Sequence, residues 1–113
     1  MKHDDARTIT LSILQQCVGD QDLVELRDSF LQAAIRYARI RADWYLSDED
    51  KRRDTEEERS RAHDAFIDSC NALSRIMSKQ GLDTTWRETL RADRKAIGDL
   101  ACYIHFLLGV RAR

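Results

Sequence analysis

Apolar residues recur at alternating intervals of three and four between positions 21 and 46, and neither proline nor glycine interrupts them. The positions in this seam are Leu23, Leu26, Phe30, Ala33, Tyr37, Ile40 and Trp44. A period near 3.5 keeps one face of an α-helix apolar, which favours lengthwise packing against another helix. With Asp20 as its N-cap, the pattern predicts a helix over Gln21–Leu46, about 39 Å long.

The rest of the chain also favours helices, because it contains no proline and only four glycines. We expect a first, shorter helix from Asp5 to Val18, with Gly19 as its C-terminal stop. The alternation of Ile9, Leu11 and Ile13 with polar residues is also a strand pattern, but a lone strand would have no partner in this chain.

The start of the third helix is ambiguous, because residues 47–61 are all polar and contain two capping signals. Ser47 followed by three acidic residues is one of them. Thr55 with Glu58 three residues later forms a capping box and is the other. We favour the second, which predicts a helix over Glu56–Gln80 and leaves residues 47–55 as a solvated connection or a frayed helical extension.

A fourth helix is expected to open at Asp83 or Thr85 and to run to the end of the apolar C-terminal segment. Its seam consists of Trp86, Leu90, Ile97, Leu100, Ile104 and Leu107. Short connections make successive helices antiparallel. The sequence therefore predicts one all-α domain over residues 1–113, an up-down bundle of four helices, one short and three long.

Charge and apolar runs limit the possible environments of the chain. The 19 basic and 20 acidic residues leave a net charge of −1, so no general positive field draws the chain to nucleic acid. The longest apolar run, Leu100–Val110, is shorter than the about 20 residues of a membrane span. The N-terminus lacks the apolar segment of a signal peptide, and the three cysteines form no CxxC pair. We expect a cytoplasmic protein with reduced thiols and no membrane contact.

The stretch "RAHDAFIDSC" over residues 61–70 contains potential metal ligands. On a helix, His63 and Cys70 share the apolar side. Together with Cys102 and His105 they would make a two-cysteine, two-histidine set suited to zinc. His63 and Cys70 lie two turns apart, about 10 Å along the helix, which is too far for one ion. We therefore expect no metal and no cofactor.

The carboxylates of this stretch, Asp64 and Asp68, lie on the wet side of the same helix. With Asp93 and Glu57 they could bind Mg²⁺ and a phosphorylated substrate. No ExxE or ExxH pair accompanies them. A solvated face with ion pairs is the commoner explanation for such residues.

Asp93 interrupts the apolar seam of the fourth predicted helix. A buried carboxylate costs several kcal/mol unless it is paired. We expect a structural partner, such as Arg36, Arg39 or a tryptophan N–H, and regard a ligand contact as the alternative.

Two groups of arginines suggest a contact with nucleic-acid phosphates. They are Arg36, Arg39 and Arg41 in the second helix and Arg87, Arg91 and Arg94 in the fourth. No helix-turn-helix pattern accompanies them, and arginines on long helices usually pair with acids or cover apolar surface. Nucleic-acid binding is therefore an alternative and not the expectation.

The segment "LACYIHFLLGV" is apolar around nearly its whole circumference. A helix of this kind must be enclosed on all sides, which a four-helix bundle does not provide. The apolar residues that such a bundle would leave exposed are Tyr103, Phe106 and Val110. We expect them to form a homodimer contact. Gly98 and Gly109 would permit close approach. The alternative is that the first helix covers this surface.

Three segments, "RIRADWYL", "ERSRAHDAFIDSCNALSR" and "DRKAIGDLACYIHFLLGVRAR", resemble a family of short, uncharacterised helical proteins from Gram-positive bacteria and their mobile elements. The resemblance covers most of the chain from Arg36 onward. It implies a bacterial cytosolic protein and assigns no residue a role.

These patterns together favour a binding or regulatory module that self-associates over an enzyme. No GxSxG, Gly-rich phosphate loop or HExxH occurs in the chain. The alternatives are a metal-dependent, phosphate-processing enzyme that uses the acidic residues and an accessory protein that binds nucleic acid.

Overall fold

A computed structural model of the chain describes residues 3–109, and the side chains from Asp5 onward. The helices are α1 (His3–Gln16), α2 (Gln21–Leu46), α3 (Glu49–Lys79), α4 (Thr85–Leu90) and α5 (Arg94–Ile104). A π-helical turn, η1 (His105–Gly109), continues α5. The described residues contain no strand, so the predicted all-α class is confirmed.

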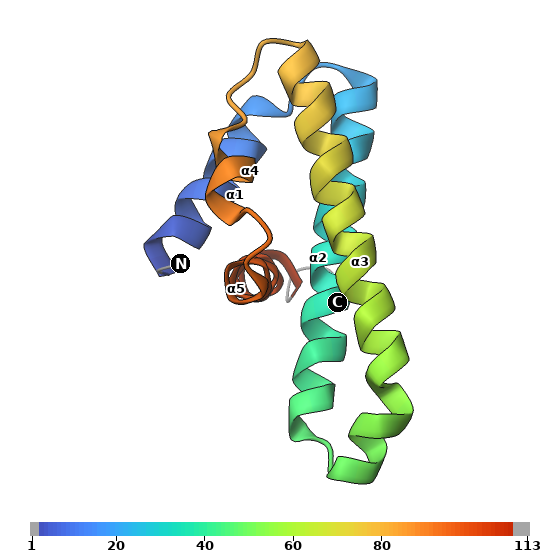
Figure 1. The fold of residues 1–113 in the computed structure, drawn as a ribbon. Coiled ribbons are helices and arrows are strands. Elements are labelled where there is room, and N and C mark those ends of the chain that lie inside the picture. The colour runs from blue at the N-terminus through green and yellow to red at the C-terminus, as the bar shows by residue number, and fades with distance from the viewer. Residues whose placement is uncertain (1–2, 110–113) are drawn as a thin grey trace.

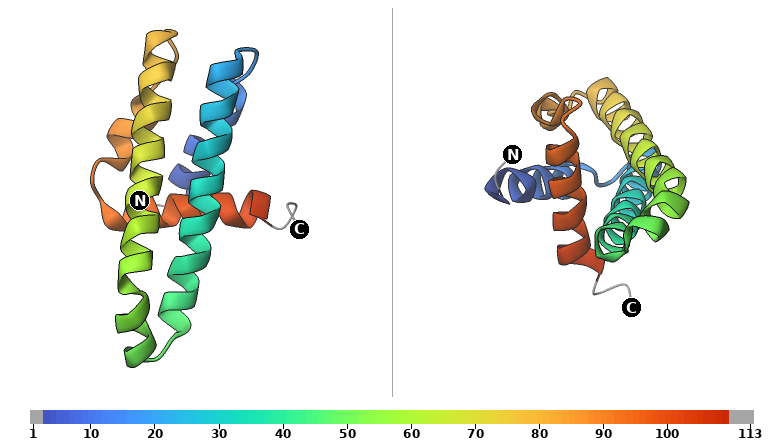
Figure 2. Two further views of the ribbon diagram at one scale, coloured as in Figure 1. Left: turned by 90° about the vertical axis from the view of Figure 1, so that its right-hand side faces the viewer. Right: turned by 60° about the horizontal axis from the view of Figure 1, so that its bottom comes forward.

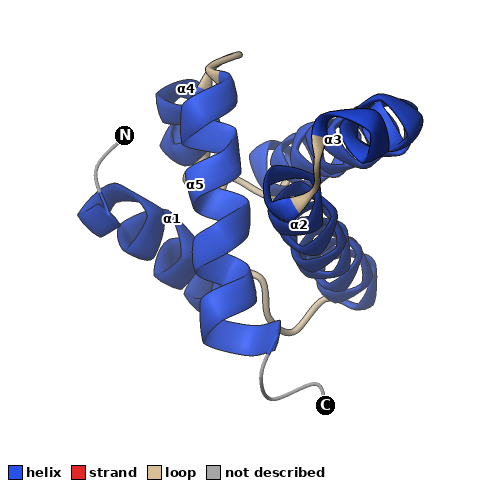
Figure 3. Cartoon of the chain, turned by 90° about the horizontal axis from the view of Figure 1, so that it is seen from below, coloured by secondary structure: helices blue, strands red, loops and turns tan. Residues whose placement is uncertain are grey.

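The two longest helices, α2 and α3, form an antiparallel hairpin in which they lie side by side (Figure 1). α5 runs across this hairpin and not along it (Figure 2). α1 lies on the other side of α5, so that α5 is placed between α1 and α2 (Figure 3). An up-down arrangement of four helices is therefore not confirmed, and the position of α5 across α2 is the feature that shapes the surface.

The third helix begins at Glu49, seven residues before the predicted start at Glu56. Asp48 caps it by accepting a hydrogen bond from the Lys51 N–H at 2.8 Å. Arg52, at the end of the first turn, donates to the carbonyls of Trp44 at 3.0 Å and Tyr45 at 2.7 Å. These two bonds tie the first turn of α3 to the last turn of α2, which favours a helical conformation of the charged segment. The preferred start at Thr55 was wrong.

The predicted fourth helix is divided into α4 and α5, because the backbone turns at Arg91, which has φ 51° and ψ −138°. Asp93 is the N-cap of α5 and accepts hydrogen bonds from Lys95 N–H at 2.9 Å and Ala96 N–H at 3.2 Å. It is exposed. The expectation of a buried Asp93 paired with Arg36 or Arg39 was therefore wrong, since the break removes Asp93 from the seam.

The core lies where α5 and α4 meet the hairpin. Phe30 of α2 contacts the rings of Phe66 and Trp86, with centroids 5.4 and 5.8 Å away. α1 adds Ile13 and Cys17, both fully buried. A helix in the first segment is confirmed, over His3–Gln16 in place of the predicted Asp5–Val18. Its Ala6, Ile9 and Ile13 are buried, and Leu11 is exposed.

No helix within residues 3–109 combines the length and apolar character needed to span a bilayer.

Candidate anion-binding cleft

A cleft of about 350 Å³ lies where the N-terminal end of α5 crosses the hairpin. We call it the basic cleft. It is lined by Tyr37, Arg41, Trp44, Tyr45, Arg59, Arg94 and Lys95. Four of these seven residues are basic and none is acidic, so the cleft has a positive electrostatic potential in a protein of net charge −1.

Three helices position these side chains. α2 supplies Tyr37, Arg41, Trp44 and Tyr45, whose spacing of four, three and one residues places them along one face. α3 supplies Arg59, and the first turn of α5 supplies Arg94 and Lys95.

Tyr37 forms the floor of the basic cleft and is only 2% exposed. Its ring stacks on Phe66 and meets the His63 ring edge-on. Its hydroxyl forms no hydrogen bond within the described part of the chain, and it is not among the fully buried polar atoms. Burial raises the pKa of Tyr37, and the positive charges of Arg41, Arg59 and Arg94 act against that rise. The phenol therefore remains protonated, faces three guanidinium groups and has a proton to donate to an anion.

Arg41 is held in place without a carboxylate. Its guanidinium carbon lies 5.1 Å from the centroid of the Tyr45 ring, and its Nη1 lies 3.4 Å from the sulfur of Cys102. Its guanidinium also passes directly over Gly98 of α5. The charge of Arg41 is thus fixed in position by a ring, a thiol and a glycine, and its remaining N–H groups are available.

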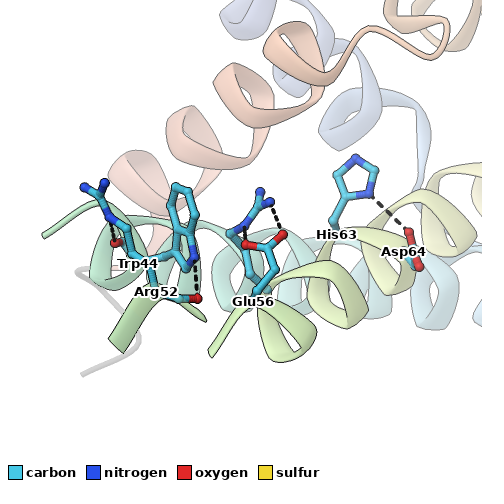
Figure 4. A network of polar contacts seen from close by, with 6 residues as sticks. Trp44, Arg52, Glu56, His63 and Asp64 are labelled. Atoms are coloured by element: carbon cyan, nitrogen blue, oxygen red, sulfur yellow. Dashed lines mark hydrogen bonds and ion pairs between the residues drawn. The ribbon is translucent and has the colours of Figure 1, made fainter. Parts of the chain in front are cut away.

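Arg59 is the one cation of the basic cleft that forms an ion pair. Its Nη2 and Nε lie 2.6 and 3.2 Å from the two carboxylate oxygens of Glu56 (Figure 4). This hydrogen bond lowers the pKa of Glu56 and raises that of Arg59. The guanidinium also lies 4.6 Å from the Trp44 ring. Among the described residues, Arg94 and Lys95 have no ion pair.

The four residues predicted as ligand or buried polar contacts do not form one site. His63 lies behind Tyr37, with its Nε2 buried and unpartnered and its Nδ1 3.2 Å from Asp64 (Figure 4). The Asp64 and Asp68 carboxylates are exposed on α3, and Asp93 caps α5.

The four residues considered as zinc ligands, His63, Cys70, Cys102 and His105, do not form a site either. Within residues 3–109, no three His, Cys, Asp or Glu side chains are close enough to hold a metal ion. Cys70 is 1% exposed, and burial raises its pKa to about 12, so it is not a thiolate at neutral pH. Cys102 is exposed and contacts Arg41.

Two of the three predicted self-association residues, Tyr103 and Phe106, line a second hollow of about 330 Å³ between α1 and α5. It is lined by Ala6, Asp99, Cys102, Tyr103 and Phe106. Phe106 is 73% exposed, while α1 covers only part of this surface. Val110 lies outside the described residues.

Only one arginine from each predicted group reaches the basic cleft, namely Arg41 and Arg94. Arg87 instead bonds to Asn71 at 2.9 Å. Arg59 and Lys95 were not predicted from the sequence, because no local pattern distinguishes them. The helical face shared by Tyr37, Arg41, Trp44 and Tyr45 could have been recognised from their spacing in the sequence.

Comparisons of the chain with protein-family models, with curated proteins and with solved structures gave no match.

Proposed function

We propose that this chain is a cytosolic binding module that holds a small phosphorylated or carboxylated ligand in the basic cleft. The observation that carries the proposal is the convergence of Arg41, Arg59, Arg94 and Lys95 around the unpartnered hydroxyl of Tyr37. Guanidinium groups match the two oxygens of a phosphate or carboxylate, and lysine adds a point charge.

Binding without turnover fits the chemistry of the lining residues. The basic cleft contains no carboxylate, imidazole or thiol that could serve as a general base. The metal-dependent alternative has less support, because Asp64, Asp68 and Asp93 are separate, exposed residues.

A small ligand fits better than a nucleic-acid strand. The volume of the basic cleft is at the lower end of the about 300–1,000 Å³ typical of small-molecule pockets. The neighbouring hollow, which shares Trp44, is lined by two acidic residues, Asp43 and Glu58, and by one basic residue, Lys51. These carboxylates would repel the phosphates of a strand that continued beyond the cleft.

Calorimetric titration with inorganic pyrophosphate at low ionic strength tests the proposal. We expect saturable binding to the unmodified protein and a loss of about tenfold or more in affinity for Arg94→Gln and for Lys95→Gln, since each removes a charge-assisted contact. Arg39→Gln removes the same charge from an exposed position outside the cleft and is the matched control. No binding to the unmodified protein, or an equal loss in the control, would contradict the proposal.

Self-association through the Phe106 surface is a second proposal, supported by the 73% exposure of that ring beside Tyr103. A symmetric contact between two copies would bury it. Light scattering at tens of micromolar should then give the mass of a dimer, and Phe106→Asp should give a monomer. Leu46→Asp changes an apolar residue that is even more exposed, at 87%, and should leave the mass unchanged. A monomeric unmodified protein would reject this proposal.

A further inference from the structure

We infer that the ligand of the basic cleft is a phosphate ester of nucleotide size, whose flat ring stacks on Tyr45 while its phosphate occupies the space between Arg41, Arg94 and Lys95. This inference rests on the proposed function and makes it specific. It comes from three features of the cleft: an exposed ring, an excess of charge and a limited volume.

The exposed ring is that of Tyr45, which lines the basic cleft and is 54% exposed. Two neighbours fix its orientation. The Arg41 guanidinium lies over the ring, and Trp44 meets it nearly perpendicularly, with ring centroids 5.1 Å apart and an interplanar angle of 86°. A ring that is already fixed loses little conformational entropy when a second ring stacks on it.

The charge of the cleft matches a phosphate better than a carboxylate. Four cations line it, and Glu56 neutralises one of them, which leaves a net charge of +3. A phosphomonoester carries about −1.5 to −2 at neutral pH, and a second phosphate increases that charge. A single carboxylate would leave most of the positive charge uncompensated.

The volume limits the ligand to one such unit. A space of about 350 Å³ holds a phosphate together with a sugar and a ring. The hollow that shares Trp44 has two acidic residues, Asp43 and Glu58, and one basic residue, Lys51. Longer polyanions are therefore disfavoured at the end of the cleft where Trp44 lies.

A matched pair of ligands tests the contribution of the ring. Adenosine 5′-monophosphate and ribose 5-phosphate carry the same phosphate and sugar, and only the first has a flat ring. We expect the nucleotide to bind about fivefold or more tightly than the sugar phosphate, as base–aromatic stacking provides. Tyr45→Ala should remove this preference, so that the variant binds the two ligands with similar affinity. Leu46→Ala, at the adjacent exposed position, should keep the preference.

Nuclear magnetic resonance of the nucleotide gives a second readout. Stacking on Tyr45 should shift the adenine proton signals upfield, and Tyr45→Leu should remove the shift while Tyr45→Trp retains it. Equal affinities for the two ligands, or adenine signals that do not move when the nucleotide is bound, would overturn this inference and leave the proposed function in place. Failure of pyrophosphate and both ligands to bind would overturn both.

Discussion

The guanidinium of Arg41 lies against the backbone of Gly98, where a Cβ built on the glycine would be 3.1 Å from its Cζ and Nε atoms. This contact couples the crossing of α5 over α2 to the position of a cation in the basic cleft. A helical glycine elsewhere is a cost, but here its missing side chain makes room for a charged group.

Gly98→Ala should therefore separate stability from binding. The added methyl group is closer to Arg41 than ordinary contact allows, so the guanidinium must move by a few tenths of an ångström. Alanine also favours the helix by about 0.5–1 kcal/mol. We expect an unchanged or slightly higher melting temperature and a several-fold weaker affinity for pyrophosphate. Tight binding with a lowered melting temperature would contradict this account of the contact.

Removing one cation from α5 should stabilise the protein in the absence of ligand. Arg94 and Lys95 face Arg41 and Arg59 across the basic cleft, and each like-charge pair near the surface costs a few tenths of a kcal/mol. Arg94→Gln should raise the melting temperature by about 2 °C at low salt. The gain should disappear in high salt, because ions screen the repulsion. Arg39→Gln, outside the cleft, should show neither effect, and a lower melting temperature for Arg94→Gln would count against like-charge repulsion in the cleft.

Asp93 should behave as a helix cap and not as a buried charge. Its carboxylate accepts hydrogen bonds from two N–H groups of α5, and asparagine can replace it as an acceptor at this position. Thermal denaturation should show a loss of about 1 kcal/mol for Asp93→Ala and a much smaller loss for Asp93→Asn. A large loss for asparagine would mean that the negative charge itself is required.

Replacement of Arg91 by glycine should increase the stability of the protein, because glycine adopts the backbone conformation at this position without strain. The φ of 51° with ψ of −138° at Arg91 lies in a region that L-residues rarely adopt, at a cost of about 1–3 kcal/mol. The side chain of Arg91 is exposed and forms no ion pair among residues 3–109, so little is lost with it. We expect Arg91→Gly to unfold at a higher denaturant concentration than the unmodified protein, whereas Arg91→Ala should give no gain.

The three cysteines should differ in reactivity. Cys17 and Cys70 are buried, and burial raises the pKa of both thiols, to about 12 for Cys70. Cys102 is exposed at the surface of α5. A thiol reagent at neutral pH should label one cysteine rapidly in the native protein and all three in denaturant. Mass spectrometry of the labelled peptide should identify Cys102, and rapid labelling of Cys70 would contradict the packing of α3 against the core.

The helices could be located from local signals. The bounds predicted for α2 are those observed, because Asp20 and the apolar seam act within a few residues of one another. The starts of α3 and α5 could not be predicted from local signals. Arg52 stabilises the first turns of α3 through carbonyls of α2. The break at Arg91 depends on packing that the spacing of apolar residues does not reveal. Asp93 was misassigned for that reason.

The basic cleft could be predicted from local sequence signals only in part. Tyr37, Arg41, Trp44 and Tyr45 share a helical face, and this follows from 3.6 residues per turn. The tertiary structure brings the other three cations to this face. Arg59 reaches it because α3 pairs with α2, and Arg94 and Lys95 reach it because α5 crosses the hairpin (Figure 2). Periodicity and capping are short-range effects, so they specify each helix and its apolar side. The crossing of α5 depends on the fit of many side chains from distant segments, and it places the cations in one cleft.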